Sequence, residues 1–201
     1  MNLFDMDGAF YRIGTVLADI FLLSLLWIIF SIPLLTIGAS TTAVYYVCTK
    51  KAAGSDSYIL KGFLKSFKDN LLISTAVFAI LIVIGIIIWV NYRALGEVEM
   101  GFLHFPVRVA LVIVTIQMVF VSMYVFPIIS RFNVTVKNAL KFALQLSNLH
   151  LLSSLSNVVL FVAVCAVTMW IPALFIFIPG VFAYFSAGLF VKIFRKHNPD
   201  F

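Results

Sequence analysis

Long runs of apolar residues separated by short polar segments dominate this sequence. Residues 71–90 and 109–130 contain no acidic or basic side chain, and residues 151–191 form a further uncharged stretch of 41 residues. About 20 helical residues cross a hydrocarbon core of ~30 Å, so this last stretch is too long for one helix. Pro172 lies at its middle and favours a break there. The pattern predicts transmembrane helices.

We expect an all-α, polytopic helical membrane protein with one transmembrane domain over residues 1–201. Two connecting segments, near 58–70 and 134–146, place apolar residues on one helical face and lysines on its flank, which is typical of amphipathic interfacial helices. Their lysines are predicted to contact lipid phosphates; they are Lys61, Lys65, Lys68, Lys137 and Lys141. The five predicted spans lie near 16–35, 71–90, 109–130, 151–171 and 173–191.

Composition agrees with lipid as the solvent of this chain. Hydrophobic residues make up 63% of the sequence and charged residues 11%, whereas a soluble domain has roughly 25% charged residues. The net charge of +6 would suggest nucleic acid as the partner of a soluble protein. Here the basic residues lie in short segments between apolar runs, so the expected partner is the lipid bilayer and not nucleic acid.

The distribution of lysine and arginine predicts the orientation. Of the 14 basic residues, 11 fall in three segments: between spans one and two, between spans three and four, and after span five. Cytoplasmic segments carry the excess of basic residues. We therefore expect an N-outside, C-inside, multi-pass membrane protein.

No pattern of catalytic or metal-binding chemistry is present. Cys48 and Cys165 form no CxxC pair, and the three histidines have no metal-ligand spacing. General acid–base catalysis needs titratable groups that converge, which the apolar spans do not offer. The prediction is therefore no enzyme, with no catalytic residue, no cofactor and no metal site.

The segment 31–49 (SIPLLTIGASTTAVYYVCT) is the best candidate for a binding site. Pro33 and Gly38 disfavour a continuous helix, and a helix that restarts near Thr41 would present free N–H groups. With the hydroxyls, these groups could bind a carboxylate, phosphate or sugar oxygen. Alternatively, small residues let two helices approach and the hydroxyls bond to backbone carbonyls. The candidate residues are Pro33, Thr36, Gly38, Ser40, Thr41 and Thr42.

Two ionisable residues are expected near the outer ends of spans one and three. Asp19 and Arg108 would lie at similar depth on the same side, and ionisable residues at membrane depth are functional candidates. One interpretation is an intramembrane Asp19–Arg108 ion pair. The other is that each side chain reaches interfacial water separately.

Residues in the first half of the chain follow one family pattern; they are Pro33, Thr36, Gly38, Ala39, Thr42, Ala43, Tyr45, Phe63, Phe67, Lys68 and Asn70. The stretch 137–140 (KNAL) also looks like a later basic helix of the same family. Over most of its length the chain resembles the YesL-like family of small bacterial membrane proteins of unknown function. The resemblance implies a location in the bacterial plasma membrane and an accessory role in carbohydrate uptake, because family members often lie beside sugar-uptake transporters, and it brings no catalytic residues.

Two functions stay open at the level of sequence. The first is a non-enzymatic accessory or regulatory protein that is linked to carbohydrate uptake and partners a sugar-uptake transporter. The second is a small transporter or channel for a small solute, formed by self-association. A possible internal duplication, in which Lys61-x-x-Leu64-Lys65 matches Lys137-x-x-Leu140-Lys141, favours the second because transporters often contain repeats.

Overall fold

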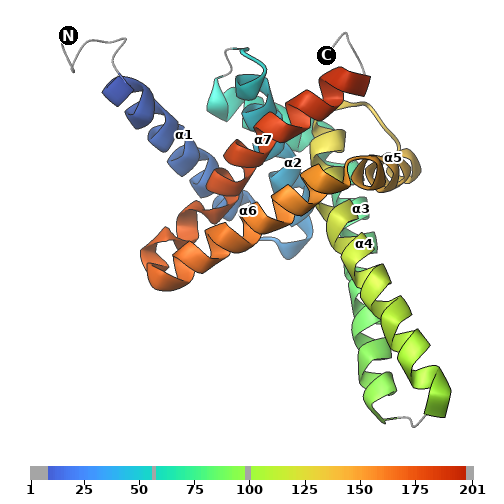
Figure 1. Cartoon of the computed structure of the whole chain (residues 1–201). Coiled ribbons are helices and arrows are strands. Elements are labelled where there is room, and N and C mark those ends of the chain that lie inside the picture. Colours follow the sequence, from blue (N-terminus) through green and yellow to red (C-terminus); the bar gives the residue numbers. More distant parts are fainter. Residues whose placement is uncertain (1–8, 56–57, 98–100, 198–201) are drawn as a thin grey trace.

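The computed structural model describes residues 9–55, 58–97 and 101–197, and this part of the chain is helical (Figure 1). Short 3-10 turns precede α2 and α4 and link α6 to α7; they are Leu34–Thr36, Gly101–Leu103 and Pro172–Phe177. The α-helices are α1 (Ala9–Phe30), α2 (Ile37–Ala52), α3 (Ile59–Glu97), α4 (His104–Arg131), α5 (Val136–Leu149), α6 (Leu151–Trp170) and α7 (Ile178–His197).

Within the described residues, five helices are long and apolar enough to cross a membrane: α1, α3, α4, α6 and α7. The prediction of an all-α protein with five such helices is confirmed. The expected break at Pro172 is also present, because α6 ends at Trp170 and a 3-10 turn starts at Pro172. Proline lacks an N–H and cannot continue the hydrogen-bonded ladder of the preceding helix.

The chain contains three helical hairpins, α1–α2, α3–α4 and α6–α7. The loop that connects the two helices of each hairpin lies away from the end of the molecule where α7 ends (Figure 1). The first described turn of α1 lies at that same end. The expected N-outside, C-inside arrangement would place these two ends on opposite sides of a bilayer. They lie at the same end of the structure because α2 returns the chain towards the end where α1 begins.

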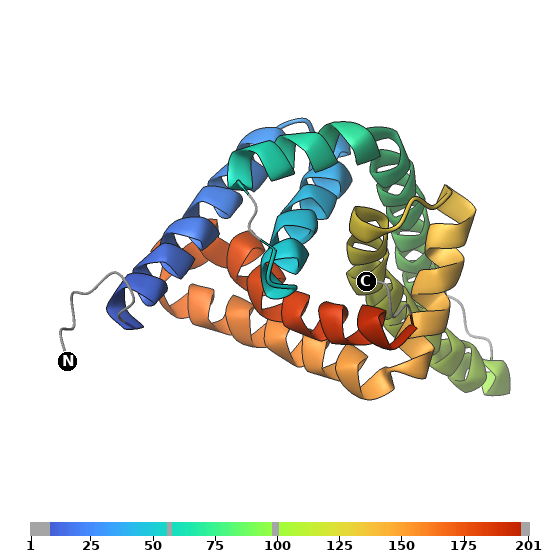
Figure 2. The same ribbon diagram turned by 90° about the horizontal axis from the view of Figure 1, so that it is seen from above.

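Residues 58–70 are not a separate helix. They belong to the start of α3, which runs without interruption through the second predicted span. In Figure 2 the first third of α3 runs in a different direction from the rest, so the helix bends without breaking. The second predicted interfacial segment does form its own helix, α5, which ends at Leu149 before α6 begins.

The centre of the molecule lies where α2, α4 and α7 meet. The Phe190 ring stands edge-on to the rings of Tyr45 and Tyr124, at centroid distances of 5.7 and 5.1 Å. The tyrosine hydroxyls hydrogen-bond to Ser186, at 3.2 Å, and to Ser154, at 3.1 Å. All five side chains are buried, so the centre is filled with satisfied polar groups and packed rings.

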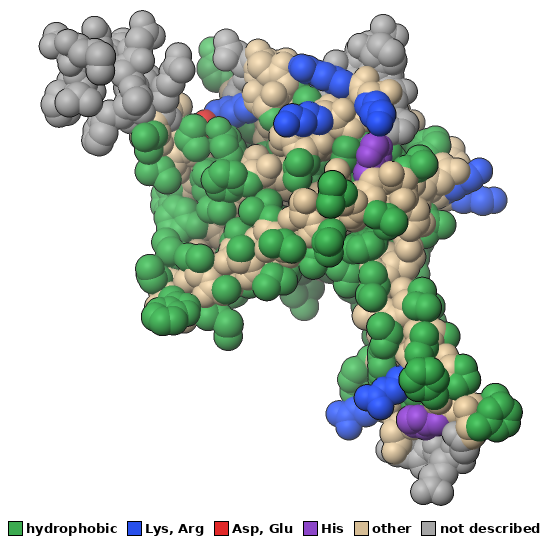
Figure 3. All heavy atoms as spheres, in the orientation of Figure 1, with side chains coloured by type: hydrophobic (Ala, Val, Ile, Leu, Met, Phe, Trp, Pro, Cys, Tyr) green, Lys and Arg blue, Asp and Glu red, His purple; other side chains and the backbone are tan. Residues whose placement is uncertain are grey.

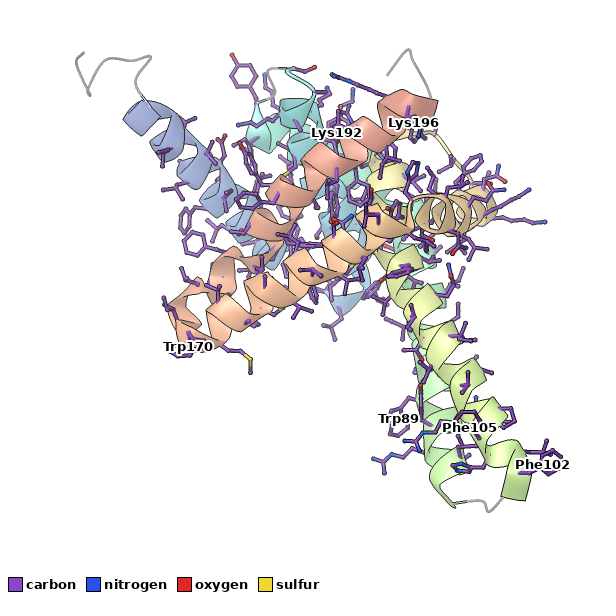
Figure 4. The ribbon with its side chains drawn as sticks, in the orientation of Figure 1. Trp89, Phe102, Phe105, Trp170, Lys192 and Lys196 are labelled. Carbon is purple, nitrogen blue, oxygen red and sulfur yellow. The ribbon has the colours of Figure 1, made fainter. Side chains whose placement is uncertain are left out.

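Aromatic and basic side chains mark opposite ends of the molecule. Trp89, Phe102 and Phe105 lie towards the tip of the α3–α4 hairpin and Trp170 lies at the α6–α7 turn, whereas Lys192 and Lys196 point from the other end (Figure 4). Hydrophobic side chains cover most of the face between these ends (Figure 3). Aromatic belts and basic ends are typical of the two interfaces of a membrane protein.

Candidate functional site

The turn between α1 and α2 is closed by Thr36. Its hydroxyl lies 2.6 Å from the Phe30 carbonyl oxygen and 2.7 Å from that of Pro33, and donates to them. The Phe30 carbonyl ends α1 and has no partner within the helix, which is costly in hydrocarbon. The Pro33 carbonyl also accepts a hydrogen bond from the Thr36 N–H at 2.8 Å. Thr36 therefore serves the backbone of this turn.

Gly38 is the point of closest approach between α2 and α3. A Cβ atom at this position would lie 2.5 Å from the Ser74 carbonyl oxygen and 2.8 Å from Phe78 Cβ. Real Cβ atoms do not come this close to backbone oxygen, so a larger residue would push the two helices apart. Gly38 lets α2 pack directly against α3, as the packing interpretation of the segment expects.

Two neighbouring hydroxyls lie in the same contact. Thr42 Oγ1 lies 3.0 Å from the Gly38 carbonyl oxygen and 2.8 Å from Ser74 Oγ, which joins α2 to α3. Ser40 is also buried, but its hydroxyl has no hydrogen-bond partner among the described residues. Most of the predicted hydroxyls are thus used within the fold, and their convergence on a ligand stays a prediction.

Thr41 faces α1 and borders a cavity. Its hydroxyl donates to the Ile37 carbonyl oxygen at 2.8 Å and accepts a hydrogen bond from Trp27 Nε1 at 3.0 Å. The adjoining cavity of about 610 Å³ is lined by side chains of α1, α2, α4, α6 and α7. Its few polar groups come from Trp27, Thr41, Tyr45 and Ser122, and the rest of its wall is apolar. The cavity therefore suits an apolar or amphipathic molecule.

The predicted Asp19–Arg108 ion pair was wrong. Asp19, on α1, forms a salt bridge with Lys51 near the end of α2. Arg108 lies in the second turn of α4, on the α3–α4 hairpin. The partner differs from the expected one because α2 brings its own basic end alongside the first half of α1. The pair is largely shielded, with 14% of Asp19 and 25% of Lys51 exposed.

The last turns of α2 hold a second polar cluster, which the sequence did not single out. Arg131, at the end of α4, donates from Nε to Thr49 Oγ1 at 2.8 Å. Its guanidinium carbon lies 5.9 Å from the centre of the Tyr46 ring, and Lys50 Nζ lies 4.8 Å from the same ring. Of these contacts, only that between Tyr46 and Lys50 could have been predicted from the sequence, because the two residues are one helical turn apart.

The five lysines that were predicted to contact lipid phosphates are exposed; they are Lys61, Lys65, Lys68, Lys137 and Lys141. The apolar faces beside these lysines were expected to lie on lipid. They pack against other helices of the protein. Phe63 is buried against Phe30 of α1, with centroids 5.4 Å apart. Ala139 and Ala143 of α5 are fully buried in the main core. These faces pack on protein, while the lysines stay free to reach headgroups.

Residues 20–92 match the sequence pattern of a family described as "Protein of unknown function, DUF624". The chain is also 30% identical over 172 residues to the uncharacterized protein YteU of Bacillus subtilis (strain 168), which covers 83% of this chain and 72% of that relative. The chain belongs to the DUF624 family. No solved structure matches it.

The DUF624 match covers the segment that carries the candidate site. It extends from Ile20 in α1 through the α1–α2 turn and α2 to Tyr92 in α3. Thr36, Gly38 and the Trp27–Thr41 contact all lie inside it. The bacterial relative and the five apolar helices identify a multi-pass membrane protein. Neither the family description nor the relative's name states an activity.

Proposed function

We propose that this DUF624 protein is a non-enzymatic accessory or regulatory subunit of a membrane complex that takes up carbohydrate. The observation that carries the proposal is the closed centre of the molecule. Phe190, packed between Tyr45 and Tyr124, occupies the position where a path between α2, α4 and α7 would run. Because aromatic rings fill this position, we expect the chain to act by binding other membrane proteins and not by conducting a solute between these helices.

The α3–α4 hairpin supports a binding role. It projects from the remaining helices (Figure 1). Both of its helices expose apolar side chains. Such a surface packs equally well against lipid or against helices of another membrane protein. The link to carbohydrate uptake rests on the resemblance to the YesL-like family, whose members often lie beside sugar-uptake transporters.

The distribution of charge supports a bacterial plasma-membrane protein with its basic end in the cytoplasm. Lys50 and Lys51 lie in the last turn of α2, and the end of α2 meets the last turns of α7, where Arg195 donates to the Ala53 carbonyl oxygen. Arg93 and Arg108 belong to the α3–α4 hairpin. By the positive-inside tendency, the helix ends that carry most of the basic residues face the cytoplasm.

The proposal is tested by purification of the tagged chain from its own membranes in a mild detergent. We expect a sugar-transporter subunit to be recovered with it. A variant with Ile113→Trp on the exposed hairpin should reduce this recovery, whereas Leu152→Trp on α6, also exposed, should not. Repeated recovery of the chain alone would overturn the proposal.

A second function, a small oligomeric transporter, is favoured by the cavity beside Thr41. This alternative predicts solute flux into proteoliposomes that contain only this chain, and loss of the flux in Thr36→Val or Thr41→Val. Thr115→Val is the matched control, because the Thr115 hydroxyl bonds to the Leu111 carbonyl oxygen of its own helix at 2.7 Å. Flux with this sensitivity would replace the accessory proposal.

A further inference from the structure

Tyr46, near the end of α2, is shared by two cations that come from different helices. Lys50 of α2 and Arg131 of α4 lie 4.8 and 5.9 Å from the centre of its ring. Two positive charges therefore gather around one ring, and their summed field attracts an anion to this place.

One acid near this cluster, on α1, is already engaged. Asp19 pairs with Lys51, the residue next to Lys50. Among the described side chains, no carboxylate forms a salt bridge with Lys50, and the Tyr46 hydroxyl has no hydrogen-bond partner. Tyr46, Lys50 and Arg131 are each partly exposed, so an ammonium and a phenol O–H remain available to a ligand from outside the fold.

The cluster is held in a fixed position by helices far apart in sequence. Arg131 is tied to Thr49 across 82 residues, and Arg195 of α7 donates to the Ala53 carbonyl oxygen, just after α2, at 3.4 Å. Three helix ends thus meet at one place. Preorganised donors bind an anion with a smaller loss of conformational entropy than lysines on a freely exposed surface.

We propose that this cluster binds a phosphate group, with Lys50 Nζ and the Tyr46 hydroxyl as its direct donors and Arg131 as the neighbouring fixed charge. The site lies at the helix ends that carry most of the basic residues, which the positive-inside tendency places at the cytoplasmic surface of the membrane. Basic pockets between transmembrane helices on this side of a membrane bind anionic headgroups. The proposal does not depend on the accessory function.

The alternative is that these side chains serve only the fold. Lysine and arginine near a helix C-terminus interact favourably with its dipole, and cation–π contacts stabilise by about 0.5–1 kcal/mol at exposed sites. That interpretation predicts no special response to phosphate. It also predicts no role for the Tyr46 hydroxyl, because a cation–π contact needs only the ring.

The test uses the purified full chain in a neutral detergent, with thermal unfolding as the measurement. Phosphatidylglycerol, phosphatidylcholine or inorganic phosphate is titrated into the wild type and into three variants. Lys50→Gln removes one donor charge and Tyr46→Phe removes only the hydroxyl. Arg93→Gln, on the α3–α4 hairpin, removes a positive charge that also lies over an aromatic ring, 5.3 Å from the centre of Trp89, at the other end of the molecule, and is the control.

We expect phosphatidylglycerol to raise the unfolding temperature of the wild type more than phosphatidylcholine does. The apparent dissociation constant should increase about tenfold in Lys50→Gln and severalfold in Tyr46→Phe, which is the size expected for a lost charge-assisted hydrogen bond, and should stay unchanged in Arg93→Gln. A variant-sensitive response to inorganic phosphate alone would assign the site to a soluble phosphate compound. Equal weakening by Lys50→Gln and Arg93→Gln, or no response to either phosphate source, would overturn the proposal.

Discussion

Two regions of the molecule use polar side chains differently. One is the α3–α4 hairpin, which comprises residues 82–97 and 101–116. The other is the body, which comprises α1, α2, α5, α6, α7 and the ends of α3 and α4 that pack on them. In the hairpin, Asn91 and Thr115 bond to carbonyls of their own helices. In the body, several polar side chains also bond across to another helix, as between Thr42 and Ser74 or between Trp27 and Thr41.

This difference teaches which contacts define the fold. Exposure of apolar side chains is common to both regions, because lipid can cover either one. Within the hairpin, a polar contact also joins α3 to α4, because His104 Nε2 lies 3.1 Å from the Leu95 carbonyl oxygen. Cross-helix bonds and close glycine contacts gather in the body. We therefore expect substitutions in the body to change stability and matched substitutions in the hairpin to change it little.

The largest effect is expected for Gly38→Ala. The new methyl group would meet the Ser74 carbonyl oxygen and separate α2 from α3, which should lower the free energy of unfolding by about 3 kcal/mol. Unfolding by SDS titration in mixed micelles measures this change. Gly96→Ala in the hairpin is the control, because nothing lies within 4 Å of its Cβ. It should be neutral or stabilise by up to about 1 kcal/mol. Similar losses in both variants would contradict the comparison.

A smaller effect is expected for the Asp19–Lys51 pair. Asp19→Lys and Lys51→Asp should each destabilise the protein, because each places two like charges side by side in a largely shielded position. The double reversal should recover much of the loss, with a coupling of about 1 kcal/mol in a double-mutant cycle. Asp19→Lys combined with Arg108→Asp should show no coupling. Coupling to Arg108 would restore the pair that the structure excludes.

The smallest effect is expected for Asn157→Leu. Asn157 is fully buried, and neither atom of its amide has a hydrogen-bond partner among the described residues. Replacement by an apolar side chain of similar size should raise the free energy of unfolding by about 1 kcal/mol, because an unsatisfied polar group is removed. Asn91→Leu should change it by less than about 0.5 kcal/mol. Destabilisation by Asn157→Leu would show that the amide has a partner, such as a buried water.

Hydropathy alone predicted much of the fold. The spans in α1, α3, α4, α6 and α7 are long and apolar, and the breaks after α1 and α6 coincide with Pro33 and Pro172. The sequence did not predict α2 as a returning helix. Its 16 residues include glycine, serine and three threonines, so it resembles a broken segment. Because of α2, the first described turn of α1 and the last turns of α7 lie at the same end of the molecule.

The candidate site was predictable only where its contacts are local. The hydroxyls around Gly38 stand out in the sequence, and the packing interpretation matches their hydrogen bonds to carbonyls one turn away. The partners Ser74 and Trp27 come from other helices. Arg131 and Thr49 meet across 82 residues. No spacing rule links such positions, because tertiary packing alone brings them together.

The central position of α2 constrains the order in which the protein can assemble. Ten of its 16 residues are buried, and about 24 Å of helix falls short of a ~30 Å hydrocarbon core, so α2 depends on protein neighbours more than on lipid. One of them, Ser186 of α7, is 141 residues downstream of Tyr45. During synthesis α2 must wait for the last helix before its final environment exists, and a chain that stops before α7 leaves it incompletely enclosed.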